Sequence, residues 1–450
     1  MSNTKKVWQK ESLLDPLVES FTIGRDPQQD LLLARWDAIG SLAHCQMLYK
    51  TGLIDQATFK ALRKGLKEIL QQIESGKFEI ENGVEDVHSQ VELLLTRMDP
   101  QAGARLHTGR SRNDQVLVDL RLFVRAEIQN IVEQASELFD LLLKLSEQYK
   151  EVLLPGYTHF QVAMPSSVGL WLAAYAESLV DDLIQLQAAY QVVNKNPLGS
   201  AAGYGSSFPL DRQLTTDLLG FEELNVNAVY AQMSRGKMER VVSQSLAGLA
   251  ETLAKFAMDL VLFQSQNFGF VSFPETVTTG SSIMPHKKNP DVFELLRARC
   301  NRLKALPAQI QTITANLPSG YHRDFQIIKE QFLTAFSEME QCLAILNHVL
   351  PMMQVKKDIL QDERYRNLFS VEAVNELVKQ GLPFREAYHQ VARQIKEGAL
   401  SEPKSLKHTH IGSIGNLSNE KIKQQMEKVI ERFCFERWHK AIAKLLEWEE

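Results

Sequence analysis

The segment from Gln115 to Lys150 constrains the fold most, because it contains neither glycine nor proline and repeats apolar residues every three or four positions. The repeating positions are Leu117, Leu120, Val124, Ile128, Ile131, Ala135, Leu138, Leu142 and Leu145. This spacing is typical of a coiled-coil seam along one long helix. The segment therefore predicts a helix of about ten turns.

The same spacing recurs twice, from Leu172 to Val193 and from Val242 to Phe263. Two more long helices are predicted, one from about Asp291, which Pro307 should kink or end, and one from Phe325 to Leu350. The middle of the chain is therefore predicted to be a bundle of long helices. Further apolar residues lie off the main seams, at Phe139, Leu141, Val180 and Leu262. Such wide apolar faces indicate bundles that pack together in an oligomer, and the alternative is one large monomeric core.

A chain of 450 residues exceeds what one hydrophobic core usually supports. We predict an N-terminal helical domain at 1–110, the central bundle at 111–356 and a small C-terminal helical domain at 357–450. No stretch alternates apolar and polar residues for long enough to predict a sheet. The predicted fold class is therefore all-α.

Composition excludes several classes of protein. A net charge of -5 with 23% charged residues gives no sign of nucleic-acid binding. The four cysteines are scattered without metal-ligand or disulfide spacing, which fits a reducing compartment. No stretch reaches the ~20 apolar residues of a membrane span, and the N-terminus lacks the apolar core of a signal peptide. We therefore expect a cytoplasmic protein without nucleic-acid or membrane partners.

The stretch TTGSSIMPHKKNPD, Thr278 to Asp291, carries the clearest chemical signal. Its glycine, serines and prolines predict a mobile loop just before a helix. Backbone N–H groups, Asn289, a lysine and the N-terminus of the following helix together suit a carboxylate ligand. A solvated loop with incidental lysines is the alternative interpretation.

Part of this loop, GSSIMPHKKNP, resembles the signature GSSxMPxKxNP of the fumarase, aspartase and argininosuccinate lyase superfamily. Two further stretches, HTGRSRNDQ at 107–115 and PGYTHFQ at 155–161, resemble segments of the argininosuccinate lyase family. The similarity extends from about Asp15 to HTHIGSIGN at 408–416. It implies the superfamily fold, a central long-helix bundle flanked by two smaller helical domains.

The resemblance also implies an activity, the reversible anti β-elimination of argininosuccinate to L-arginine and fumarate through an aci-carboxylate carbanion. This reaction is the last step of arginine biosynthesis and is expected to need no metal or organic cofactor. Family members are homotetramers whose active sites are shared by three subunits.

Such an elimination needs a base, an acid and groups that bind carboxylates. By resemblance, Ser281 is the base, with Ser282 as the competing assignment. Lys287 and Asn289 would hold the carboxylate that gains charge, and Glu294 would pair with Lys287 or with a catalytic histidine. Thr158 would contact a carboxylate, and His159 would protonate the departing nitrogen. From the motif alone, His159 is more often a structural residue, and Glu294 is an exposed acid in a first helical turn.

Other residues match substrate-binding positions of the family. Arg112 and Asn113 are expected to contact the substrate, although capping of the helix that begins near Asp114 is the alternative. The remaining candidates are His88, Tyr321, Gln326 and Lys329, of which the last two share a helix face and match positions that bind the arginine end.

At two places the match weakens. Asp26 stands where the family usually has serine, and an acid there would suit the arginine end. The family's SDRDF appears as MSRGKME, which retains Arg235, a residue that would hold a carboxylate, but replaces the residues after it. The alternatives to the family activity are a sister enzyme acting on adenylosuccinate, aspartate or malate, and a structural protein of the lens-crystallin kind.

Overall fold

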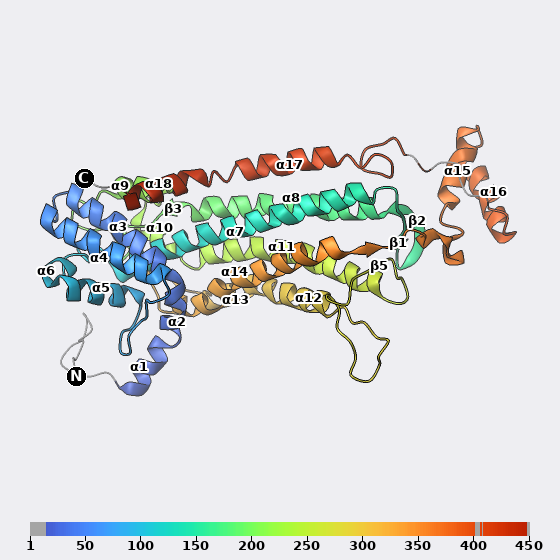
Figure 1. The fold of residues 1–450 in the computed structure, drawn as a ribbon. Coiled ribbons are helices and arrows are strands. Elements are labelled where there is room, and N and C mark those ends of the chain that lie inside the picture. The colour runs from blue at the N-terminus through green and yellow to red at the C-terminus, as the bar shows by residue number, and fades with distance from the viewer. Residues whose placement is uncertain (1–14, 401–405, 407, 448–450) are drawn as a thin grey trace.

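The body of the protein is a bundle of long helices that lie roughly parallel or antiparallel (Figure 1). The computed structural model describes residues 15–400, 406 and 408–447. The bundle consists of α7 (Arg112–Gln148), α8 (Val168–Val193), α11 (Lys237–Gln264), α12 (Asp291–Leu303), α13 (Leu306–Ile313) and α14 (Asp324–Val349). Each of the five predicted long helices is present, and the predicted all-α fold class is confirmed. The chain breaks between α12 and α13 just before Pro307, as its ring requires.

One end of the bundle carries the shorter N-terminal helices (Figure 1). They are α1 (Pro16–Ile23), α2 (Asp26–Asp30), η1 (Leu31–Leu33), α3 (Ala34–Lys50), α4 (Gln56–Glu74), α5 (Val87–Met98) and α6 (Pro100–Gly103). The short α9 (Arg212–Leu218) and α10 (Ala228–Met233) lie at the same end. This end therefore collects the first hundred described residues around the start of α7.

The segment 357–450, predicted as one small domain, is spread over the length of the bundle. Near the opposite end lie η2 (Leu350–Met352), η3 (Ile359–Gln361), η4 (Glu363–Tyr365), α15 (Ser370–Lys379) and α16 (Phe384–Lys396). The chain then returns along α8 through α17 (Asn419–Glu431) and α18 (Glu436–Glu447). A small separate core of Val374, Ala387 and Val391 holds α15 and α16 together, whereas Trp438 of α18 is part of the main core.

Three two-stranded sheets were not predicted. They pair β1 (Leu153–Thr158) with β2 (Gln161–Ser167), β3 (Lys195–Asn196) with β4 (Glu223–Leu224), and β5 (Val271–Ser272) with β6 (Gln354–Val355). The β1–β2 hairpin is antiparallel and follows directly after α7 at the bundle end opposite the N-terminal helices. Pro155 and Gly156 interrupt β1, which explains why the stretch shows no strand pattern. Among the described residues, no helix combines the length and hydropathy needed to cross a membrane.

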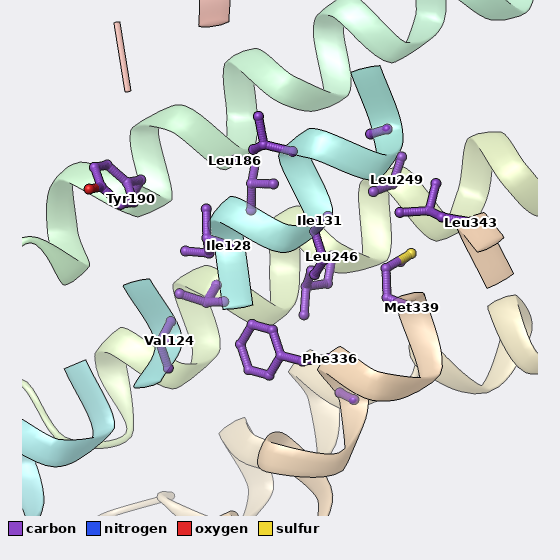
Figure 2. Packing of buried hydrophobic residues seen from close by; sticks show 14 of the residues in the cluster. Val124, Ile128, Ile131, Leu186, Tyr190, Leu246, Leu249, Phe336, Met339 and Leu343 are labelled. Carbon is purple, nitrogen blue, oxygen red and sulfur yellow. The ribbon is translucent and has the colours of Figure 1, made fainter. Parts of the chain in front are cut away.

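The predicted seam of α7 forms the centre of the core. Figure 2 shows Val124, Ile128 and Ile131 of α7 packed among residues of three other helices. These neighbours are Leu186 and Tyr190 of α8, Leu246 and Leu249 of α11, and Phe336, Met339 and Leu343 of α14. All of them are buried, so the bundle is stabilised by apolar burial along most of α7.

Two arginines of α7 are also fully buried and fix the end of α8. Arg121 donates to the carbonyl oxygens of Val192 and Val193 at 2.8 and 2.9 Å. These carbonyls belong to the last turn of α8, where a helix leaves its C=O groups without partners. Arg125 donates to the Leu219 carbonyl at 2.8 Å. Arg121 therefore satisfies carbonyl groups in the last turn of α8 and complements the negative end of its dipole, whereas Arg125 bonds the carbonyl of Leu219, which caps the end of α9.

A pair of carboxyl groups between α7 and α14 generates a pH prediction. Burial, and then the neighbouring Glu340, raise the pKa of Glu127 to about 8. The folded protein therefore holds a proton that the unfolded chain, with a glutamate pKa of about 4.3, loses earlier as pH rises. Stability should consequently fall as the pH rises through this window.

We expect Glu127→Gln to remove this decline, because the amide stays neutral at every pH. At pH 9 its melting temperature should exceed that of the wild type by about 2 °C or more, and the two should converge near pH 5. Differential scanning fluorimetry across this range measures the effect, with Glu133→Gln on the exposed face of α7 as control. If the melting temperatures of Glu127→Gln and the wild type change with pH in the same way, Glu127 does not hold a proton in the folded protein.

Candidate active site

The predicted site residues occupy three places in one chain. The first, here called the bundle-end cluster, lies beside the N-terminal helices and comprises Asp26, His88, Arg112, Asn113, Arg235, Tyr321, Gln326 and Lys329. The second is the tip of the β1–β2 hairpin with Thr158 and His159. The third is the signature loop, residues 278–291, with Ser281, Lys287 and Asn289, followed by Glu294 in the first turn of α12.

Lys329 is the charged centre of the bundle-end cluster. Its Nζ lies 2.7 Å from Asp26 Oδ1 and 2.7 Å from Asp30 Oδ1. Burial alone would lower the pKa of Lys329, but the two carboxylates outweigh burial and raise it. Burial raises the pKa of Asp26 to about 6 in spite of the lysine. The arrangement holds two acids around one cation, which leaves net negative charge near neutral pH.

Gln326 lies one turn before Lys329 and contacts the first helix. Its Nε2 donates to the carbonyl oxygens of Thr22 and Ile23, each at 3.0 Å. Arg323 Nε donates to its Oε1 at 3.0 Å. Nearby Tyr321 is 37% exposed, so its hydroxyl-bearing ring is accessible. The C-terminal end of α1 therefore borders the face that Gln326 and Lys329 share.

Arg112 and Asn113 form the first turn of α7, positioned by a capping box. Asn113 N donates to Ser111 Oγ at 3.2 Å, and Ser111 N donates to Asp114 Oδ1 at 2.9 Å. Because Ser111 and Asp114 cap the helix, the side chain of Asn113 remains available. Arg112 Nη2 donates to Glu92 Oε2 at 3.2 Å across to α5. Ser111 and Asp114 therefore cap the helix, and Arg112 and Asn113 do not have the capping role that was the predicted alternative.

His88 is buried rather than presented at a surface. Its Nδ1 lies 2.8 Å from Asp37 Oδ1 and 3.5 Å from Asp119 Oδ2. Burial and the adjacent Asp37 raise the pKa of Asp119 well above its ordinary value, whereas His88 helps to lower that of Asp37 despite burial. The two carboxyl groups therefore differ in how readily they ionise. These three residues bring potential metal-ligand atoms within 4.8 Å of one another.

Arg235 is 4% exposed and lies against the start of α14. Its Nη2 donates to the Phe325 carbonyl at 3.4 Å, and its guanidinium stacks 5.7 Å from the Phe325 ring centroid. Its Nε lies 3.4 Å from Glu239 Oε1. The positive charge of Arg235 also lowers the pKa of Asp26, so the two side chains are electrostatic neighbours.

The hairpin tip presents Thr158 and His159 to solvent. Thr158 pairs with Gln161, so His159 and Phe160 form a two-residue turn. Both turn residues have positive φ, 55° and 56°. Two-residue hairpin turns favour such angles, but glycine or asparagine usually adopts them. Strained, exposed residues of this kind often occur at functional sites.

The signature loop extends away from the bundle (Figure 1). A short bridge between Thr279 and Asn289 closes its base, with Asn289 N donating to the Thr279 carbonyl at 2.8 Å. Ser281 Oγ accepts the N–H of Met284 at 3.2 Å. Lys287 is exposed, as is Glu294, and among the contacts of the described residues there is no ion pair between them. The chain alone therefore leaves the loop's lysine free for a ligand.

These three places are too far apart to form one site within a chain. Asn113 lies in the first turn of α7 and the hairpin follows the end of this helix, and a helix of 37 residues is about 55 Å long. The structure thus brings together the residues of the bundle-end cluster but leaves the hairpin tip and the loop apart from it. Thr158, His159 and Ser281 have no partner from the cluster among the described contacts of this chain.

Sequence reasoning missed three acids of the bundle end, Asp30, Asp37 and Asp119. Asp30 lies four residues after Asp26 and hence on the same helix face, which was a usable signal. Asp37 and Asp119 lie within buried helix surfaces, where an unpaired acid would be costly. Their partner His88 is distant in sequence, so no local pattern predicts the triad.

Comparison with known proteins shows relatives over nearly the whole chain. Residues 11–304 match a family model described as lyase. The chain is 57% identical to the argininosuccinate lyase of Parabacteroides distasonis, covering 98% of this chain and 99% of the relative. It is 55% identical to that of Bacteroides fragilis over the same shares, and 36% identical to that of Thermotoga neapolitana over 87% and 98%.

Solved structures share the fold at lower identity. An EDDS lyase in complex with formate gives a TM-score of 0.74 at 20% identity, covering 97% of this chain and 94% of that chain. A fumarate lyase:delta crystallin from Brucella melitensis gives 0.70 at 17% identity, covering 85% and 93%. The long-helix bundle is therefore common to these proteins.

The paired acids around Lys329 generate a stability prediction. Lys329→Met removes the cation and leaves Asp26 and Asp30 buried together, so we expect the free energy of unfolding to fall by about 3 kcal/mol at pH 7.5. Because protonation relieves two unpaired carboxylates, the loss should shrink as the pH falls toward 5. Urea denaturation at both pH values measures it.

The matched control is the double variant Asp30→Asn/Lys329→Met, which removes one buried charge of each sign. It should recover a substantial part of the lost stability. A double variant as unstable as Lys329→Met would show that lost packing, and not unpaired charge, causes the effect.

Proposed function

Because this chain belongs to the lyase family, we propose that it catalyses the argininosuccinate lyase reaction, the reversible cleavage of argininosuccinate into L-arginine and fumarate. The observation that carries the proposal is 57% identity to a named argininosuccinate lyase over 98% of the chain. The motifs that match the family, 107–115, 155–161 and 278–291, are intact in the sequence. The reaction completes arginine biosynthesis in the cytoplasm, and three buried free cysteines support a reducing location.

The chemistry begins with removal of a proton beside one carboxylate of the succinyl group. The electron pair left on carbon spreads into that carboxylate, which becomes an aci-carboxylate with two negative charges. The bond from the neighbouring carbon to the guanidinium nitrogen then breaks on the opposite face, and the nitrogen takes up a proton as arginine leaves. Stabilising the doubly charged carboxylate is the largest electrostatic demand on the site.

The signature loop would meet this demand. Ser281 acts as the base, and the N–H of Met284 at 3.2 Å already stabilises negative charge on its oxygen. Lys287 supplies a positive charge for the aci-carboxylate, and Asn289 adds an amide donor beside it. The exposed loop must close over the substrate before these groups act, since an exposed serine has a hydroxyl pKa far too high for a base.

The hairpin tip would serve the leaving group. His159 protonates the departing nitrogen, directly or through a water molecule, and Thr158 holds a substrate carboxylate. His159 has a positive φ, 55°, in the exposed two-residue turn of the hairpin. Glu294 would pair with Lys287 or His159 in the assembled site.

The bundle-end cluster would bind the arginine end and the remaining carboxylate. Arg112 and Asn113 contact the succinyl part, while Tyr321, Gln326 and Lys329 contact the arginine part. The acids Asp26 and Asp30 suit the positive groups of arginine, and Asp26 supplies a charge where the family usually has serine. Arg235 and His88 are both buried, so they would support the cluster from the protein interior.

Assembly of the site requires several chains. We propose a homotetramer in which each active site takes the bundle-end cluster, the hairpin tip and the signature loop from three different subunits. The length of α7, about 55 Å, supports different subunits for the bundle-end cluster and the hairpin tip. Large apolar side chains at all three places are exposed and available for subunit contacts, including Phe160 at 75% and Ile283 at 83%.

Ser281→Ala tests the reaction and the base. We expect turnover of argininosuccinate to fall about 1000-fold or more, because no other group in the loop accepts the proton. Folding and substrate affinity should change little. Ultraviolet absorbance of fumarate measures turnover, with adenylosuccinate, aspartate and malate as parallel substrates.

Ser282→Ala is the matched control and should retain most of the activity. If Ser282→Ala is the inactive variant, the two serines exchange roles. Wild-type turnover of a parallel substrate at a rate comparable to that of argininosuccinate would instead contradict the proposed substrate.

Mixing two inactive variants tests the shared sites. His159→Asn and Ser281→Ala tetramers should each be inactive, but reassembly from an equal mixture should restore activity to about a quarter of the sites, where both contributing subunits carry the native residue. The measurement is fumarate release after mild denaturation and renaturation of the mixture. A fully active monomer, or no recovery in renatured mixtures whose wild-type control recovers, would exclude sites shared in this way.

A further inference from the structure

A cavity of about 450 Å³ lies beside the bundle-end cluster, between the start of α11, the end of α13 and the segment 314–320 that leads to α14. Three of its lining residues carry charge, and all three are cations: Arg235, Lys237 and Arg240. We call it the basic cavity. It contains none of the catalytic residues of the signature loop or the hairpin tip.

The positive charge of the basic cavity is poorly compensated. Glu239 is the nearest acid to Arg235, and the same carboxylate also influences the buried Arg121. Its other oxygen accepts the Gly236 N–H at 2.7 Å. Glu239 therefore serves two buried guanidinium groups, and the charge of Arg235 also acts on Asp26. Lys237 and Arg240, which have no acid partner among the described contacts, give the cavity its positive charge.

The cations that face the cavity have unused donors. Arg235 is 4% exposed, and its Nε lies 3.4 Å from Glu239 Oε1, an ion-pair contact that forms no hydrogen bond. Lys237 contacts the ring of Tyr230, with Nζ 5.5 Å from the centroid, and has no acid partner among the described contacts. Arg240 likewise pairs with no described carboxylate. A buried, positively charged group with unsatisfied donors is costly unless a ligand completes it.

The uncharged walls also suit an anion. Gln311, Asn316 and Ser319 supply amide and hydroxyl groups, and the N-terminus of the 28-residue α11 adds positive potential. Leu317 and Phe325 form an apolar side. The cavity is larger than a single chloride or carboxylate requires, and three cations match an anion with several charges.

We propose that the basic cavity binds a small phosphate-type polyanion, either an inorganic polyphosphate or the phosphate chain of a nucleotide. The succinyl part of argininosuccinate is a dicarboxylate, so malonate, also a dicarboxylate, distinguishes a phosphate-specific site from a second carboxylate site. The site does not depend on the proposed reaction.

Binding of a polyanion in the basic cavity should change the ion pair of Lys329 with Asp26. Arg235 joins the two places, because it lines the cavity and its charge acts on Asp26, the partner of Lys329. An anion that neutralises Arg235 removes this influence and makes Asp26 easier to protonate. The binding of a polyanion therefore weakens the ion pair of Asp26 with Lys329, and the affinity for the arginine end should change with it.

Isothermal titration calorimetry of the full-length protein with pyrophosphate tests the proposal, at constant ionic strength. Orthophosphate, ATP and sodium malonate are titrated in parallel. We expect one pyrophosphate or ATP per chain, with malonate much weaker. Tighter binding of ATP than of pyrophosphate would identify a nucleotide site, and the reverse an inorganic polyphosphate site.

The double variant Lys237→Gln/Arg240→Gln should weaken binding about tenfold or more, because it removes two charge-assisted contacts. The matched control, Lys144→Gln/Lys255→Gln, removes two exposed cations from α7 and α11 outside the cavity and should bind as the wild type does. Argininosuccinate turnover is assayed on the same preparations, so failure of the proposed reaction is seen separately.

Three outcomes would overturn the proposal. One is the absence of saturable binding to the wild type, and another is equal weakening in the cavity variant and the control. The third is competition by fumarate together with loss of binding in Lys287→Gln, which would place the polyanion in the active site instead.

Discussion

The continuous burial of the α7 seam is the constraint on which the rest of the structure depends. Thirty-seven residues form one helix because apolar side chains of α8, α11 and α14 cover it along most of its length. A helix this long is stable only when its apolar face is packed throughout. Its length then fixes the distance between the N-terminal helices and the β1–β2 hairpin, and so decides which chemical groups one chain can bring together.

Charge is concentrated at the end of the bundle where α7 begins. Lys329 with its two acids, the triad around His88, and the buried Arg121 and Arg125 all lie in this region. Burying charge costs free energy that apolar packing does not return. The bundle supplies enough apolar burial to tolerate this cost, and the cost is concentrated where the substrate and the polyanion are proposed to bind. The free-energy cost of buried charge therefore falls mainly at the end of the bundle where α7 begins, which is also where the ligands are proposed to bind.

Helix periodicity predicted most of the fold, because a seam such as Leu117 to Leu145 is a local pattern that tertiary packing reinforces. The hairpin escaped prediction, since Pro155 and Gly156 hide its strands and the pairing of Thr158 with Gln161 depends on a turn with unusual φ. The candidate site residues came from resemblance in three motifs. What no motif predicted was Asp30 beside Lys329, because ion pairs across 299 residues of sequence arise only from tertiary structure.

The long helix α7 also limits how such a chain can evolve. One inserted residue would turn everything beyond it by about 100° and shift it by about 1.5 Å. The seam beyond the insertion would then face solvent, and the hairpin would point in a different direction. Substitutions can accumulate on the outer face of α7, but changes in length are tolerated only in near-whole heptads, and each heptad would move the hairpin by about 10 Å. The length of α7 therefore sets the position of the hairpin, and substitutions on the outer face of the helix leave that position unchanged.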